Sequence, residues 1–216
     1  MVTNQYTRLG MALALAALLA ALPVRAFDYP LSSEAIREAY FLGKADPQKR
    51  VEFLAPYTQT PPMPETGPHV ASISFETPFV VIVERMAKAP NATTGDAEQE
   101  FLGKPGMLRM RVEIDLTTSY SWILSASSSG TRLRSGDFWK DFTIRLTQDG
   151  KEIAARSVHG VPLYTFASSD TSSQLRGAAV TLTYNAARIS SEPADVHVLT
   201  PDGQDVTATF DLGRLR

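Results

Sequence analysis

The second half of this 216-residue chain is a succession of short segments in which apolar and polar residues alternate. The clearest segment runs from Leu108 to Leu116, where every second residue is apolar and the residues between them are mostly charged. A period of two is typical of a strand with one buried and one solvated face. Similar segments recur at residues 120–126, 138–147, 152–158, 163–167, 178–186, 195–200 and 206–212.

Two of the intervals between these segments have explicit turn chemistry. Asp149-Gly150 supplies the positive φ angles of a tight hairpin, and Pro201-Asp202-Gly203 separates two further alternating segments. Seven or eight short strands joined by turns predict a mainly β fold, an antiparallel β-sandwich or barrel. We favour the sandwich, which resembles the immunoglobulin-like fold in strand pattern only. Such sandwiches host many unrelated functions, so the resemblance implies no activity.

Helix is predicted ahead of the strands. Residues 28–43 carry apolar residues near a period of 3.6, with Gly43 placed as the stop. Asp46-Pro47 then fits the N-cap and first position of a second helix. Together the two predict a short N-terminal helical hairpin over residues 27–57, which is too small to fold alone and is expected to pack on the rest of the chain.

A proline-rich connector is predicted between the helices and the strands, over residues 58–69, because its composition favours an extended conformation. The β-sandwich domain is then expected over residues 70–216. Within it, residues 79–86 fit both a helical stripe and a buried β-branched strand, and we favour a short helix after Thr77-Pro78. Asp96 is expected to cap another short helical turn.

Residues 1–26 have the three zones of a cleavable signal peptide. A polar start with one basic residue precedes the apolar stretch 9–22, and Val24-Arg25-Ala26 fits a cut between Ala26 and Phe27. Fourteen apolar residues span only about 21 Å as a helix, which is short of a bilayer core. The sequence therefore predicts a periplasmic or secreted protein with no stable membrane insertion after cleavage.

Composition argues against several classes of function. Cleavage would leave 19 basic residues against 23 acidic ones, a mildly acidic balance that argues against nucleic acid as the main partner. The chain has no cysteine, which excludes disulfides, thiol catalysis and cysteine-bound zinc, and an ordinary hydrophobic core must then hold the fold. An exported domain without disulfides points to a bacterial source.

No set of residues forms a recognisable catalytic or metal-binding motif. His69, His159 and His197 lack partners at ligand spacing, and the serine-rich segments 125–130 and 168–173 match no nucleophile motif. The acidic groups near Asp202 are interpreted as turn residues, with calcium binding as the alternative. We predict no catalytic residue, no metal site and no cofactor.

Tyr120, Trp122 and Trp139 are the candidate ligand-binding residues, because aromatic side chains at the loops of a sandwich can stack on sugars or anchor a partner. Burial in the core is the competing interpretation for both tryptophans. We therefore predict a non-enzymatic binding or structural module of the bacterial envelope, with an envelope protein or a glycan as partner. The alternatives are a glycan-binding module and a hydrolase acting on an envelope polymer.

Overall fold

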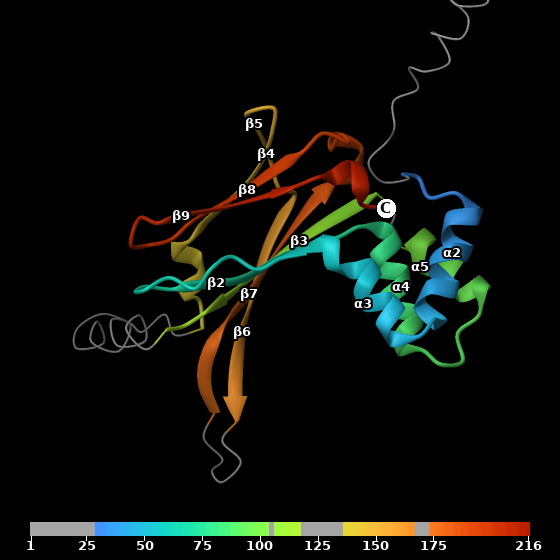
Figure 1. Cartoon of the computed structure of the whole chain (residues 1–216), viewed down its shortest axis with the longest axis horizontal. Coiled ribbons are helices and arrows are strands. Elements are labelled where there is room, and N and C mark those ends of the chain that lie inside the picture. The colour runs from blue at the N-terminus through green and yellow to red at the C-terminus, as the bar shows by residue number, and fades with distance from the viewer. Residues whose placement is uncertain (1–28, 104–105, 118–135, 167–172) are drawn as a thin grey trace, which may run out of the picture.

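The computed structural model describes residues 29–103, 106–117, 136–166 and 173–216. Two antiparallel sheets face each other, and a group of helices lies beside one end of them (Figure 1). The predicted signal peptide, Tyr120 and Trp122 lie outside the described residues. A mainly β, antiparallel fold is confirmed.

Within the described residues, four α-helices form, and side-chain caps begin several of them. Ser32 accepts a hydrogen bond from the Ala35 amide at 3.1 Å, and Asp46 accepts one from the Gln48 amide at 2.8 Å. The segment 79–86 is helical, as predicted, with Thr77 as its N-cap. The helices are α2 (Ser33–Lys44), α3 (Pro47–Leu54), α4 (Pro78–Lys88) and α5 (Thr94–Gly103).

The N-terminal helical hairpin over residues 27–57 is not confirmed, although both helices form. Helix α3 has no buried residue, whereas α2 buries Ile36 and Ala39 against Phe79 and Val83 of α4. Helix α2 therefore pairs chiefly with α4, which follows β2 in the chain. The second hydrophobic core is built by α2, α4 and α5.

Gly43 does not stop α2, since the helix continues to Lys44 and Ala45 is the C-cap. A Cβ atom on Gly43 would lie 2.7 Å from both the Met86 Cβ and the Val83 backbone oxygen. The glycine is therefore a point of close approach between α2 and α4. The prediction of a stop at Gly43 was wrong because local sequence does not show which helix faces it.

The first sheet has five strands in the order β1-β2-β3-β7-β6, and the second has four in the order β5-β4-β8-β9, all antiparallel. The strands are β1 (Thr58–Gln59), β2 (His69–Glu76), β3 (Met107–Asp115), β4 (Thr143–Gln148), β5 (Lys151–Ile153), β6 (Ser157–Phe166), β7 (Ser173–Asn185), β8 (Ala194–Leu199) and β9 (Asp205–Phe210). Short 3-10 turns form at Ala55–Tyr57, Phe138–Asp141, Ala186–Arg188 and Leu212–Arg214.

The two turns with explicit chemistry are confirmed. Asp149 has φ 50° and Gly150 φ 69° between β4 and β5, as a hairpin that matches the strand twist requires. Gly203 has φ 89° between β8 and β9. These positive φ angles mark the two places where the chain turns back between neighbouring strands of the second sheet.

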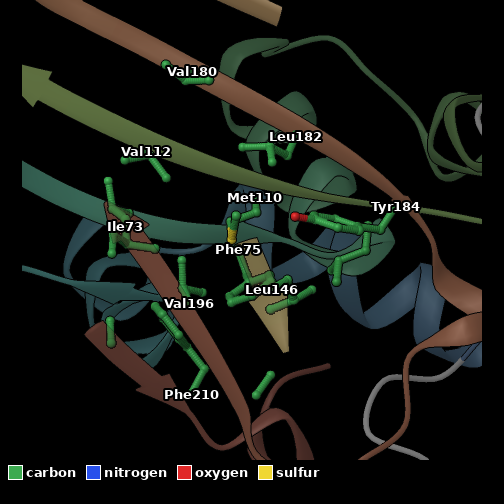
Figure 2. Packing of buried hydrophobic residues seen from close by; sticks show 14 of the residues in the cluster. Ile73, Phe75, Met110, Val112, Leu146, Val180, Leu182, Tyr184, Val196 and Phe210 are labelled. Carbon is green, nitrogen blue, oxygen red and sulfur yellow. The ribbon is translucent and has the colours of Figure 1, made fainter. Parts of the chain in front are cut away.

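The sheets share one hydrophobic core, in which strands of both contribute large side chains (Figure 2). Phe75 of β2 meets Phe210 of β9 edge to face, with ring centroids 4.8 Å apart. Met110 of β3 and Leu146 of β4 are fully buried in the same cluster. Burial of this apolar area is what holds a chain without disulfides in two stacked layers.

Arg216 ties the helices to the sheets. Its backbone amide donates to the Tyr57 hydroxyl at 2.7 Å, and its guanidinium lies 2.6 Å from the Glu38 carboxylate of α2. The Thr77 hydroxyl donates to the Arg216 backbone oxygen. The cap of α4 is thereby connected to the end of the second sheet.

Candidate functional site

Strand β6 is an edge of the five-stranded sheet. It pairs with β7 on one side, and no described residue pairs with its other side. Three large apolar side chains project from it into solvent: Val158 is 51% exposed, Val161 47% and Tyr164 47%. In Figure 1 the paired strands β6 and β7 run away from the helices.

The strand also lacks charge. None of the residues from Ser157 to Phe166 is Asp, Glu, Lys or Arg. Edge strands are normally protected from pairing with another chain by charged side chains, by brevity or by proline. Strand β6 has ten residues, and of these three protective features it has only a proline, Pro162. It therefore keeps most of the backbone groups that another strand can bind.

An open groove of about 310 Å³ lies beside β6, between its inward face and the start of β4. Lys140 and Thr143 are its polar lining residues. The apolar lining comes from both sheets and from the turn before β4: Trp139, Phe142, Ile144, Val158, Val180 and Leu182. Small-molecule and peptide sites are typically apolar concavities of this kind with a few polar groups.

Gly160 lets the groove form. The indole ring of Trp139 lies so close to Gly160 that a Cβ atom there would overlap the ring. The centre of the ring is also 5.6 Å from the Lys140 ammonium, which in turn lies 2.6 Å from the Asp137 carboxylate. Trp139 is half-buried and held between these groups, so its ring is part of the groove wall and does not lie flat on the surface.

Of the three candidate ligand-binding residues, the structure places only Trp139, because Tyr120 and Trp122 are outside the described residues. The Trp139 indole nitrogen is buried and has no hydrogen-bond partner among the residues described. Sequence reasoning missed Val158, Val161 and Tyr164, because it divided this stretch between two strands, 152–158 and 163–167. The unbroken absence of charge from residue 157 to 166 is the sequence signal by which this strand could have been found.

The opposite side of the two sheets is bridged by the proline-rich connector. The Gln204 side chain donates to the Thr66 backbone oxygen at 3.2 Å, and the Gln59 side chain donates to the Thr209 backbone oxygen. A second open groove, of about 490 Å³, remains between the connector and β9. The connector segment 60–64 forms part of the wall of this groove, so the chain itself already lies along this side of the sheets.

Two acidic groups beside the helices have structural partners. In a third groove, between α4 and α5, Asp96 accepts hydrogen bonds from the Thr93 amide and hydroxyl at 2.7 Å each. These bonds lower the pKa of Asp96, and they make it the third residue of a capping box with Thr93, not the N-cap we predicted. Glu100 in the same groove lies 3.8 Å from Arg85.

The histidines and turn acids do not gather. His69 is buried, His159 is exposed, and His197 lies 3.2 Å from the Thr207 hydroxyl on the solvated face of β8. Asp202 accepts from the Thr200 hydroxyl and, at 2.6 Å, from the Gln204 amide nitrogen. Across the described ranges, no three His, Asp or Glu side chains lie close enough together to hold a metal ion.

Comparison with protein-family models, with curated proteins and with solved structures finds no match to this chain. In the described part of the chain, no helix has the length and apolar character needed to cross a membrane. Strand β6 and the groove beside it are therefore the candidate functional site.

Proposed function

We propose that this chain is an exported, non-enzymatic protein of the bacterial envelope that binds another polypeptide strand along β6. The observation that carries this proposal is the ten-residue, uncharged edge with three exposed apolar side chains. An extended segment that pairs with such an edge gains main-chain hydrogen bonds, and the pockets beside the edge select its side chains. The groove beside Trp139 provides such a pocket.

The order of the strands supports an immunoglobulin-like sandwich as the framework. Taken in chain order, β2 to β9 correspond to positions A, B, C, C′, D, E, F and G of that fold. The neighbours β2-β3-β7-β6 then read A-B-E-D, and β5-β4-β8-β9 read C′-C-F-G. In this assignment β6 is strand D, which is an edge of its sheet. An experimental structure in which these neighbours were exchanged would remove this part of the proposal.

Export is supported by the three zones of residues 1–26. The test is N-terminal sequencing of the protein recovered from fractionated cells of its own organism. We expect an envelope-fraction protein that begins at Phe27. A cytoplasmic protein that still carries residues 1–26 would show that this segment is not a signal peptide.

Binding along β6 is tested by site-specific photocrosslinking in intact cells. A photoreactive residue replaces Val161, and a matched variant carries the same residue at Val51 of α3, which is 62% exposed. We expect a crosslinked product of one discrete mass from position 161 and none from position 51. If position 161 gives no product, or the same products as position 51, the edge is not a binding surface.

A further inference from the structure

We propose that the strand bound by β6 is β6 of a second copy of this chain, paired antiparallel about a two-fold axis through Val161. This inference rests on the proposed function, because it names the occupant of that same edge. The two five-stranded sheets would join into one continuous sheet of ten strands. Three observations carry the proposal: the spacing of the exposed apolar residues, the absence of charge, and the position of the groove.

The exposed apolar residues are arranged symmetrically. Val158 and Tyr164 each lie three residues from Val161. In a two-fold antiparallel pair, opposite residues share a face of the sheet. The axis must therefore lie midway between one residue and its own copy on the other strand, at the level of that residue and not at the level of a peptide bond between two residues. An axis through Val161 places Val161 opposite its own copy and Val158 opposite the partner copy's Tyr164.

This register matches apolar to apolar at all three exposed apolar positions. Aromatic residues opposite β-branched residues are among the favourable cross-strand pairs, and directly opposite Cβ atoms lie about 4.5–5.5 Å apart. An axis through Pro162 would instead set Tyr164 opposite Gly160. With the axis at Val161, Pro162 faces Gly160 of the other copy, which has no side chain to obstruct it.

A second copy is electrostatically compatible with this edge. Two identical strands always bring like residues near each other, and opposed like charges destabilise a pair. Strand β6 contains no Asp, Glu, Lys or Arg, and its one histidine is His159. In the proposed register His159 lies opposite Leu163 and not opposite its own copy. Self-association therefore meets no charge repulsion within the paired strands.

The groove gives the partner's tyrosine a place to bind. Val158 lines the groove and lies on the same face of β6 as Tyr164, since their positions differ by an even number. The residue opposite Val158 is Tyr164 of the second copy, so this ring reaches the groove wall formed by Trp139. The groove is thus completed only when two copies pair, once on each side of the axis.

The test uses cysteine crosslinking, which the cysteine-free chain makes unambiguous. The full chain, expressed with its own N-terminal segment and purified, carries Val161→Cys, Tyr164→Cys or the control Val51→Cys. Among these three variants, each tested by itself, mild oxidation is expected to give a covalent dimer only with Val161→Cys. In Tyr164→Cys the two introduced thiols would lie six residues apart in register, roughly 20 Å, so that variant alone stays without a crosslink. A mixture of Val158→Cys and Tyr164→Cys chains is expected to crosslink.

Sedimentation measures the same association without a crosslink. We expect a dimer whose dissociation constant rises at least about 10-fold in Val161→Lys, because two ammonium groups then face each other, and changes little in Val51→Lys. Circular dichroism confirms that both variants fold. A monomer at all concentrations, or equal crosslinking of Val161→Cys and Tyr164→Cys, would overturn the inference.

The two proposals fail in different ways. If the purified chain is monomeric while position 161 crosslinks in cells to a protein of different mass, the second copy is wrong and the binding edge stands. If position 161 gives no crosslink in cells and the chain is monomeric, both are wrong.

Discussion

Replacing Gly160 with alanine tests how the groove beside β6 is built. The added methyl group would overlap the Trp139 ring at Cε2, Cδ2 and Nε1. Either the strand shifts or the ring leaves its place, and overpacking of this kind costs about 1–3 kcal/mol. The backbone of Gly160 has no positive φ, so alanine meets no conformational penalty of its own there.

The surface area of Trp139 sets an upper limit on this cost. A fully buried tryptophan removes about 150–250 Å² from water, worth roughly 4–6 kcal/mol at about 25 cal/mol per Å². Trp139 keeps a minor part of its surface in water, so expelling its ring costs somewhat less than that, roughly 3–5 kcal/mol. Exposure of its unpaired indole nitrogen recovers part of this cost, since water can then accept its hydrogen bond.

The measurements are urea unfolding and tryptophan emission. In a Trp122→Phe background Trp139 is the single tryptophan, and we expect Gly160→Ala to shift its emission to the red and to lower the free energy of unfolding by about 1–3 kcal/mol. Gly103→Ala in α5 is the control, because a Cβ atom there meets nothing within 4 Å. If both variants behave alike and the emission is unchanged, Trp139 does not pack on Gly160.

Two further predictions concern the helices and the tyrosines. Gly43→Ala should lower the free energy of unfolding, because its Cβ would lie 2.7 Å from the Met86 Cβ, although alanine favours a helix interior by about 1 kcal/mol. Urea unfolding, with Gly103→Ala as the control, measures the sign of the change. A stabilised Gly43→Ala would contradict the close crossing of α2 and α4. Burial raises the pKa of Tyr57 and Tyr184 above the ordinary 10.0, and in Tyr184 the Glu152 charge adds to it. A tyrosine in the unfolded chain ionises at a lower pH than these buried ones, so the stability that the two tyrosines contribute is complete below about pH 10 and is lost as pH rises further. From about pH 8 to 11 the urea midpoint of unfolding should therefore fall less steeply with pH in Tyr184→Phe than in the unaltered chain. Equal slopes in the two proteins would count against the raised pKa.

Local sequence predicted those elements whose cause is local. The alternation over residues 108–116 coincides with β3 (Met107–Asp115), and Thr77-Pro78 begins α4 because a side-chain cap and a proline at the first position act within one turn. The predicted strands 152–158 and 163–167 divide what is one strand, β6, and the interval between them holds Gly160 and Pro162, each of which weakens a strand by itself. Their tolerance in β6 depends on Trp139, which packs on the glycine, and on the edge position, which leaves the proline at the border of the sheet.

The contrast between the two sides of the sheets argues that the exposed edge is used. On one side the proline-rich connector is held across the sheets by Gln59 and Gln204, so an extended segment of the chain itself lies against β9. On the other side no described segment covers β6, and valine and tyrosine side chains lie in solvent there. An uncharged apolar edge promotes aggregation unless it has a defined partner. A monomer would gain solubility from a single lysine at position 161, so the presence of valine favours a paired edge over an idle one.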